Sequence, residues 1–435
     1  MYFLKSIYVS FTSMKFTNLG RISSVYKFNS LFLPKYAHIN KVEKVYRYIC
    51  GFIFICITPI LAMLQRCISP LILIRVGKIY NYRLGHFILE FDWYKTHRNN
   101  KMQKYANKFP ICFDVFFLSS ISCNSYFEQV VKSNLNVIPR EIVLGIFLFN
   151  KFLTKNSKYL VNLPIRPTDL SYLDDTPPNC DLSSEDTDFG KNQLMKLGFN
   201  PDQEIVCFFV RDASYEKNFF PEKDHNVTAY RNSSLTSFER SMEFLAIKGF
   251  IVVRMGKTGD KPLEVKHPNI IDYPFSTIRN DFMDFYLSSK CKFAVATDSG
   301  AMMLPILFRK PIFLANVPGF HGLIQGKCIT LFQFKTFINL DSGGEMKLQD
   351  LLQRGFSTIE SGKGFELAQI GHLENSPDEI FDSIIEMLEL LKSNSKVIYQ
   401  KSQQRLNLLL KSSTSKETTA LLSNSWNKKH PNFLD

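Results

Sequence analysis

The stretch FAVATDSGAMM, residues 293–303, joins a β-prone apolar run to an apolar, helix-like segment through Thr297, Asp298, Ser299 and Gly300. In an open parallel sheet, ligands bind at the carboxyl ends of the strands. A helix that begins there presents unpaired backbone N–H groups and a partial positive charge, which suit a diphosphate, and Gly300 lets the ligand come close. The stretch therefore predicts a phosphate site at Thr297, Ser299 and Gly300. Asp298 would repel phosphate, so a plain helix cap is the alternative.

Strands and helices alternate on both sides of this stretch. After residue 200 the expected strands are 204–212, 250–256, 269–273, 292–297 and 311–317, and the expected helices are 235–248, 279–290, 299–308 and 374–391. Before it, strands are expected at 70–77, 111–120 and 135–139, with a helix starting near Gly85 and another at 125–133. Alternation of this kind indicates parallel sheets in an α/β fold.

The length of the chain suggests two or three domains. We expect an N-terminal extension at 1–66, a Rossmann-like domain at 67–190, a second one at 191–395 and a polar tail at 396–435. The turn-rich segment 174–190 is typical of a linker or long surface loop. Ser376 and Glu379 predict a capping box at the start of the last long helix.

The chain carries 53 Lys and Arg against 40 Asp and Glu, a formal charge of +13. Such an excess favours an anionic partner: nucleic acid, an acidic membrane surface or a phosphorylated substrate. No zinc-finger spacing or RNA-recognition signature is present, which argues against nucleic acid. The nine cysteines are scattered without a C-x-x-C pair, as expected for free thiols of a reducing, cytoplasmic compartment that bind no metal.

The N-terminal extension is basic and ends in an apolar segment. Residues 1–42 hold six Lys and Arg and no acid, and residues 49–64 hold no charge between Arg47 and Arg66. The segment is shorter than the roughly 20 residues that span a bilayer, and Pro59 would kink a helix. It is either a buried or interfacial helix or a monotopic anchor at the inner face of an anionic membrane. In composition alone, the extension also resembles an organellar transit peptide.

Two arginines end neighbouring apolar strands of the C-terminal half. Arg211 closes the strand at 204–212, and Arg254 closes the next one. Both are expected at the sheet edge where the helix at 299 begins, and guanidinium groups bind phosphate oxygens well. Arg211 and Arg254 are therefore candidate catalytic groups, although strand-end charges are often only surface residues. Nearby candidates for donor and phosphate binding are Arg231, Asn232, Gly256 and Lys257.

The N-terminal half offers fewer candidates. Gly85 and His86 follow its first strand, and Asn124 follows the second. His86 could act as a general base, although a lone histidine is more often structural. Gly85 and Asn124 are candidate acceptor-binding residues. The P-loop, dinucleotide and kinase signatures are missing, as is an Asp-x-Asp motif flanked by apolar residues, so we expect neither a metal nor another cofactor.

Several motifs together resemble a known family. They are FFVRD (208–212), AYRNSS (229–234), VVRMGK (252–257), IIDYPFSTIRNDFMDFYLSSKCKFAVATDSG (270–300) and LFRKPIFLANV (307–317). In this order they resemble a bacterial family classed as glycosyltransferases of surface-polysaccharide gene clusters. The likeness covers roughly residues 70–395, from RLGHF (83–87) to GHLENSPDEI (371–380), and excludes the first 66 residues.

The resemblance implies a metal-independent glycosyltransferase of GT-B type, with two Rossmann-like domains facing across a cleft. The C-terminal half would hold a nucleotide sugar and the N-terminal half a glycan or lipid-linked acceptor. Arg211, Arg254 and Arg231 would stabilise charge on the leaving diphosphate, and His86 would deprotonate the acceptor hydroxyl. Asp281 would touch the base or ribose.

The chain departs from the family at two places. The family tends to have a His-Asp-Tyr-Arg-Asn run, whereas here residues 226–229 separate His225 from Tyr230. The family often has a second Ser or Thr where Asp298 stands.

Two other functions remain open. A non-catalytic α/β protein that binds a phosphorylated glycan or lipid would keep the C-terminal arginines but would not need Gly85 and His86. A structural membrane-associated scaffold would have no convergent basic site. For Asp281 and Asp284, which lie one helical turn apart, a solvated helix face is the alternative to a contact with the base or ribose.

Overall fold

The computed structural model describes residues 41–106, 111–119, 122–153, 157–163, 171–174, 176–320, 329–393, 397–414 and 417–435. The chain forms two compact units that interleave along the sequence, whereas the sequence suggests consecutive domains. Unit 1 holds Met1–Tyr82, Asn100–Cys123 and Val131–Leu163, and unit 2 holds Arg83–Asn99, Asn124–Val130 and Pro164–Asp435. Of the expected N-terminal extension (1–66), residues 1–40 lie outside the described residues.

Unit 1 is built on a small parallel sheet. Its strands are β1 (Ile72–Ile79), β2 (Ile111–Leu118) and β3 (Leu160–Val161), in the order β2-β1-β3. The helices α3 (Lys41–Ile68) and α6 (Arg140–Leu153) pack on each other and on β1. The strand expected at 135–139 is a single bridge between Val137 and Phe116.

Unit 2 contains a seven-stranded sheet in the order β12-β9-β8-β7-β4-β5-β6, and every neighbouring pair is parallel. Its strands are β4 (Ile205–Phe209), β5 (Ile251–Arg254), β6 (Ile270–Asp272), β7 (Cys291–Ala296), β8 (Ile312–Val317), β9 (Ile329–Phe334) and β12 (Leu421–Leu422). The central strands β4 and β8 are buried along their whole length. This explains why they read as continuous apolar runs, since helices cover both faces of such sheets.

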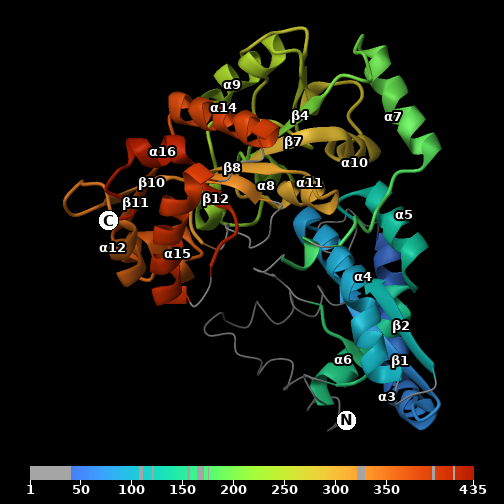
Figure 1. Cartoon of the computed structure of the whole chain (residues 1–435). Coiled ribbons are helices and arrows are strands. Elements are labelled where there is room, and N and C mark those ends of the chain that lie inside the picture. The colour runs from blue at the N-terminus through green and yellow to red at the C-terminus, as the bar shows by residue number, and fades with distance from the viewer. Residues whose placement is uncertain are drawn as a thin grey trace. The chain divides into compact units, whose positions relative to one another are not determined.

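Helices α9 (Thr236–Ile247) and α14 (Pro377–Ser393) pack on one face of this sheet, and α10 (Asp281–Lys290) and α11 (Met303–Leu307) contact β7 (Figure 1). Phe238 of α9 and Met387 of α14 join Phe208 and Phe313 in one apolar core. The other α-helices that lie in or enter unit 2 are α4 (Leu84–Ala106), α5 (Ser125–Asn134), α7 (Ser184–Lys196), α8 (Ser214–Phe219), α12 (Leu348–Gln353), α13 (Gly362–Leu367), α15 (Gln400–Thr414) and α16 (Asn424–Lys429). Short 3₁₀ helices and a hairpin complete it: η1 (Ser171–Leu173), η2 (His225–Arg231), η3 (Tyr273–Phe275), η4 (Gly300–Met302), η5 (Phe356–Thr358), η6 (Val397–Tyr399), β10 (Thr336–Asn339) and β11 (Ile370–Leu373).

Most element predictions are confirmed. The strands expected around 204–212, 250–256, 269–273 and 311–317 form, each shorter by a few residues. Helix α9 ends before Gly249, which adopts φ 92° as a helix-terminating glycine should. The predicted capping box is present, because Ser376 Oγ accepts from Glu379 N at 3.3 Å and Glu379 Oε2 accepts from Ser376 N at 2.7 Å.

Three expectations are wrong in detail. The single helix expected at 299–308 is the three-residue η4 followed by the five-residue α11. The expected linker 174–190 contains the start of α7, because Ser183 and Asp186 form a capping box there. The polar tail belongs to the fold: β12 pairs with β9, and Trp426 is fully buried. Short apolar clusters are enough to hold the tail in place, because their side chains pack against the core of unit 2.

Within the described residues, no helix is long and apolar enough to cross a membrane.

Candidate functional site

The order of the strands marks one place on the large sheet. After β4 the chain adds β5 and β6 on one side, and it then returns to place β7 on the other side of β4. At such a switch point the connections leave in opposite directions and open a crevice at the carboxyl ends of the two strands. The residues there are 210–212 after β4 and 297–300 after β7, which we call the switch point. Arg211 N donates to Thr297 Oγ1 at 2.8 Å and joins the two loops.

Arg211 lies within a compact polar cluster. Its Nε donates to Asn232 Oδ1 at 3.1 Å, and its Nη2 lies 3.0 Å from Glu216 Oε2. Burial and the nearby charge of Arg231 lower the pKa of Arg211. Burial alone would raise the pKa of Glu216, but hydrogen bonds from Lys223 and Thr228 and the charge of Arg211 bring it to about 2. Glu216 is therefore charged at neutral pH, and Asn232 and Glu216 both hold the Arg211 side chain.

Arg231 pairs with Asp298 across the switch point. Its Nε donates to Asp298 Oδ2 at 2.7 Å and its Nη2 to Asp298 Oδ1 at 2.9 Å. Burial opposes the charge on Arg231, but Asp298 raises its pKa overall. The alternative of a helix cap by Asp298 is wrong, because Ser299 is the residue that precedes η4 and no side chain caps it. Arg231 therefore neutralises the charge of Asp298, which would otherwise repel a phosphate at this loop.

Ser299 and Gly300 follow Asp298, the partner of Arg231, in the chain. Ser299 Oγ is buried and has no hydrogen-bond partner among the described residues. A Cβ on Gly85 would come within 2.8 Å of Gly300 Cα, so the first turn of α4 lies directly against this loop. That turn also carries His86, which is half-buried. The short η4 and α11 supply a weaker dipole than the long helix expected, so side chains and loop amides matter more.

Lys335, which follows β9, is a site residue that the sequence analysis missed. It is 2% exposed, and its Nζ donates to the carbonyl oxygen of Asn232 at 2.9 Å. Burial lowers the pKa of Lys335, and Glu374 opposes that shift. Asn232 thus links Lys335 to Arg211. The sequence did contain a sign of this role. Lys335 is the only charged residue in the segment 329–339, and a lysine in a mostly apolar segment is rarely buried without a partner.

Arg254 lies at the same sheet edge, and its Nη2 is 3.7 Å from Asp212 Oδ2 of the switch point, but its shorter contacts are made elsewhere. It is 4% exposed, and its Nη1 donates to Lys261 O at 2.6 Å and to Asp272 Oδ1 at 3.0 Å. A Cβ on Gly259 would meet Arg254 Nη2 at 2.7 Å, so the segment wraps the guanidinium closely. A cavity of about 330 Å³ lies nearby at the edge strand β6 and is lined by Leu263, Val265, Lys266, His267, Pro268, Ile270 and Asp272. Gly256 and Lys257 follow Arg254 in the loop, and a role for these three residues in donor binding stays a prediction.

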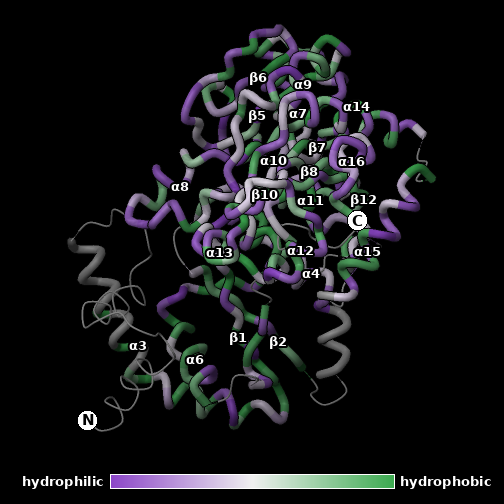
Figure 2. Tube along the Cα trace, turned by 90° about the vertical axis from the view of Figure 1, so that its left-hand side faces the viewer, coloured by the Kyte–Doolittle hydropathy of each residue, from purple (hydrophilic) through white to green (hydrophobic). Residues whose placement is uncertain are grey.

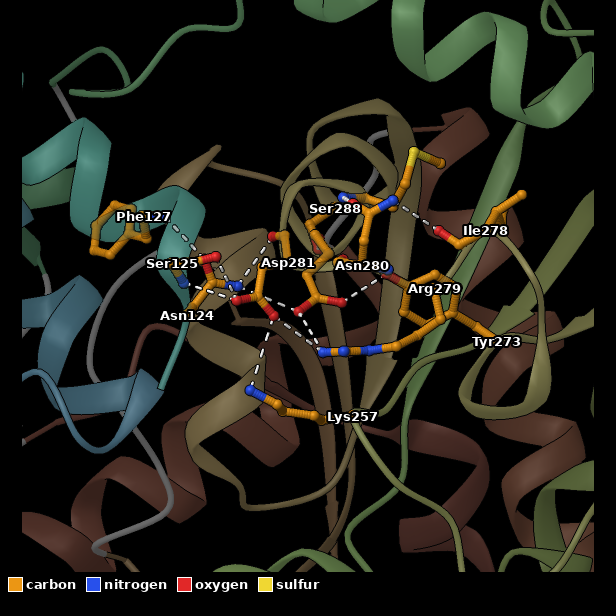
Figure 3. A network of polar contacts seen from close by, with 12 residues as sticks. Asn124, Ser125, Phe127, Lys257, Tyr273, Ile278, Arg279, Asn280, Asp281 and Ser288 are labelled. Atoms are coloured by element: carbon orange, nitrogen blue, oxygen red, sulfur yellow. Dashed lines mark hydrogen bonds and ion pairs between the residues drawn. The ribbon is translucent and has the colours of Figure 1, made fainter. Parts of the chain in front are cut away.

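A second polar network joins α5 to α10 within unit 2 (Figure 3). Asp281 Oδ2 accepts from Ser125 N at 2.7 Å, and Lys257 Nζ lies 3.8 Å from Asp281 Oδ1. Burial opposes ionisation of Asp281, but hydrogen bonds from Ser125 and the charge of Lys257 lower its pKa. Asn124 Nδ2 donates to Asp281 O at 3.0 Å. The structure thus brings Asn124, Lys257 and Asp281 together, and these contacts tie the segment 124–130 to α10.

Asp284 is the buried member of this network. Tyr273 donates a hydrogen bond from its hydroxyl to Asp284 Oδ1 at 2.8 Å, and Arg279 Nη2 lies 3.7 Å from Asp284 Oδ2. Burial raises the pKa of Asp284 to about 6. Asp284 is therefore a packed structural group, so the two aspartates do not form the solvated helix face considered above.

The described residues hold no group of three or more His, Cys, Asp or Glu side chains that could bind a metal ion.

Three solved structures share features of this fold. The glycosyl transferase family 9 protein of Veillonella parvula DSM 2008 aligns with 74% of this chain and 98% of its own, at 12% identity and a TM-score of 0.43. The ADP-heptose lps heptosyltransferase II of E. coli aligns with 55% of this chain and 84% of its own, at 10% identity and a TM-score of 0.36. An iron-containing dodecameric glycosyltransferase of enterotoxigenic E. coli H10407 aligns with 55% of this chain and 57% of its own, at 10% identity and a TM-score of 0.27.

No protein-family model matches the chain, and no curated protein matches it in sequence. The structural values are too low to support an argument about activity. The function of the chain therefore has to be argued from the residues of the switch point.

Proposed function

We propose that this protein is a nucleotide-sugar-dependent, metal-independent glycosyltransferase of GT-B type with a glycan or lipid-linked acceptor. The observation that carries the proposal is the set of groups at the switch point. Arg211, Arg231 and Lys335 gather there beside the unpartnered Ser299 hydroxyl and the exposed Gly300. Fixed cations and free donors at the carboxyl edge of a parallel sheet suit a diphosphate.

Glycosyl transfer requires two things of this site: stabilisation of the leaving diphosphate and removal of a proton from the acceptor. The acceptor oxygen forms a bond to the anomeric carbon of the sugar, and the bond from that carbon to the diphosphate oxygen breaks. The electron pair leaves with the nucleoside diphosphate, whose growing charge Arg211 and Arg231 would stabilise. The acceptor hydroxyl loses its proton to a base, and His86 is our candidate because the contact between Gly85 and Gly300 places its turn beside the phosphate loop.

The acceptor side of the proposal rests on charge. A chain with a formal charge of +13 is attracted to anionic surfaces, which suits a phosphorylated or lipid-linked acceptor presented at the inner face of a membrane. Surface-polysaccharide synthesis, as the family resemblance implies, would supply such an acceptor.

The first test is a thermal shift of the purified protein with UDP, GDP, CMP, dTDP and ADP, each with and without EDTA. A ligand that binds only the folded state raises the melting temperature. We expect one nucleotide to do so regardless of EDTA. A shift that EDTA abolishes and Mg²⁺ restores would overturn the metal-free mechanism, and no shift with any nucleotide would overturn donor binding.

Variants then locate the site. Arg231→Met combined with Asp298→Leu removes both charges of the pair, so neither group is left buried alone. We expect this double variant to lose the nucleotide shift, while Arg240→Gln, at the exposed Arg240–Asp378 pair, keeps it. His86→Gln should keep the shift but lose release of nucleoside diphosphate in an acceptor-dependent assay. Binding without any turnover by the unaltered protein would favour the non-catalytic alternative.

A further inference from the structure

Helix α3 of unit 1 has its polar and apolar faces reversed relative to a helix of a water-soluble protein. Among its described side chains Thr58, Ala62 and Gln65 are buried, as is Ser69 just beyond its end, and these positions are spaced three or four apart. Most helices bury an apolar stripe and expose polar residues. In α3 the exposed side is apolar instead, and it comprises Ile49, Ile53, Ile60, Met63 and Leu64, which are 51% to 68% exposed. We call these five residues the outward face of α3.

Hydrogen bonds fix this orientation. Gln65 Nε2 donates to Ile74 O of β1 at 2.8 Å, and its Oε1 accepts from Asn150 Nδ2 of α6 at 2.9 Å. Arg66 Nη2 donates to Asn150 Oδ1 at 2.9 Å. Turning the outward face inward would break these bonds and bury polar atoms without partners.

The apolar surface extends beyond α3. Twelve of the twenty-four exposed large hydrophobic side chains among the described residues belong to unit 1, the smaller unit. Besides the outward face they are Ile68, Leu71, Ile111, Phe113, Ile142, Phe152 and Leu153. Figure 2 colours α6 and the described end of α3 mostly as hydrophobic. An excess of exposed apolar side chains is typical of a unit that carries an interaction site.

The charges near α3 indicate what covers this surface. The first two turns of the helix contain Lys41, Lys44 and Arg47 against the single acid Glu43, and residues 1–42 contain no acid at all. A basic segment beside an apolar helix face is suited to the interface of an anionic bilayer, where the side chains reach the acyl boundary and the cations meet the headgroups. The uncharged segment 49–64 is too short to span a bilayer of roughly 20 residues' thickness, and Pro59 interrupts it.

We propose that the outward face of α3 docks this protein onto an anionic membrane surface. The inference rests on the proposed function only for its purpose, which is to bring the enzyme to a lipid-linked acceptor.

The test is co-sedimentation of the full chain with vesicles of pure phosphatidylcholine and with vesicles that also contain about 30% phosphatidylglycerol, at physiological salt. We expect binding to the anionic vesicles that is at least about tenfold stronger than to the neutral ones. A variant with Ile60→Ser, Met63→Ser and Leu64→Ser should lose most of this binding. Its matched control carries Ile247→Ser, Leu367→Ser and Leu408→Ser, which are equally exposed apolar residues of unit 2, and should bind as the unaltered chain does.

Three results would contradict the proposal, and two of them would identify another occupant of the outward face. Equal binding by the two triple variants would overturn the proposal. The proposal would also be overturned if the unaltered chain formed a dimer in solution, did not bind vesicles, and became monomeric in the first triple variant. A second copy would then cover the outward face. Binding that appears only after residues 1–40 are removed would assign the face to the chain's own N-terminal segment. Nucleotide thermal shifts of the first triple variant should match those of the unaltered chain, so failure of donor binding and failure of docking are distinguishable.

Discussion

Arg231 and Arg254 lie at the carboxyl edge of the same sheet, and each pairs with an aspartate. The partner of Arg231 is Asp298, in the loop that carries Ser299 and Gly300, and the Arg231 side chain is 23% exposed. Arg254 pairs most closely with Asp272 at the end of β6 and more distantly, at 3.7 Å, with Asp212 of the switch point, and its side chain is 5% exposed. Arg254 also bonds the backbone of Lys261, so its contacts close a loop of the protein. The same kind of residue thus borders the proposed ligand site at the switch point and holds a loop of the protein at the edge strand.

The largest effect should come from breaking the edge pair. Arg254→Met leaves Asp272 and the carbonyl of Lys261 without their donor, and removing one partner of a buried ion pair costs about 3–5 kcal/mol. We expect urea denaturation to show a loss of this size in the free energy of unfolding. If Arg254 acts only by holding this loop, nucleotide should still raise the melting temperature of the variant by the same increment. A lost nucleotide shift with near-normal stability would instead place Arg254 in the donor site.

The next largest effect should come from the contact between α4 and the loop 297–300 of the switch point. In Gly85→Ala the new Cβ would meet Gly300 Cα at 2.8 Å and Gly300 O at 3.1 Å, and both are backbone atoms that cannot rotate away. The turn with His86 must then move, and a displacement near 1 Å at reacting groups can reduce turnover on the order of 100-fold. Steady-state kinetics should show this in kcat. Gly344→Ala is the control, since its Cβ would meet only Ser342 Oγ at 3.7 Å and should leave kcat unchanged.

The sequence predicted the elements of unit 2 well because continuous apolar runs and capping signals depend on neighbours in the chain. It also placed Arg211 at the sheet edge where the segment after Thr297 begins, since both follow strands of one parallel sheet. It could not pair Arg231 with Asp298, because loops 67 residues apart in sequence decide that contact. Nor could periodicity tell which face of α3 is buried: the apolar stripe predicts amphipathicity, and only the contacts of Gln65 and Asn150 choose its direction.

Lys335 offers a charge test of the switch point. Lys335→Met removes a cation whose field favours a bound diphosphate, so we expect nucleotide affinity to fall about tenfold. Burial holds the pKa of Lys335 in the folded state below its unfolded value, which penalises the charged form. Stability of the unaltered chain should therefore rise as pH increases from the folded pKa toward the unfolded one, and this rise should be smaller in Lys335→Met.

The pH dependence of binding runs the other way. Nucleotide affinity of the unaltered chain should fall as Lys335 loses its proton, at a lower pH than for an ordinary lysine, and isothermal titration across alkaline pH measures it. An alkaline fall of the same size in Lys335→Met would show that Lys335 is not the group responsible.

The smallest effect should separate two buried hydroxyls that look alike. Ser299 Oγ at the switch point and Ser241 Oγ in α9 are both buried without a hydrogen-bond partner among the described residues. Replacing either by Ala removes an unsatisfied polar atom, so neither variant should lose stability. If Ser299 donates to a phosphate oxygen, Ser299→Ala loses that bond and weakens nucleotide binding about threefold, or ~0.6 kcal/mol. Ser241→Ala should bind nucleotide as the unaltered chain does, because Ser241 is fully buried in α9, whose Met242 and Leu245 belong to the apolar core. Equal affinities of the two variants would mean that the unsatisfied hydroxyl of Ser299 makes no bond to the ligand. The cations alone would then hold the diphosphate.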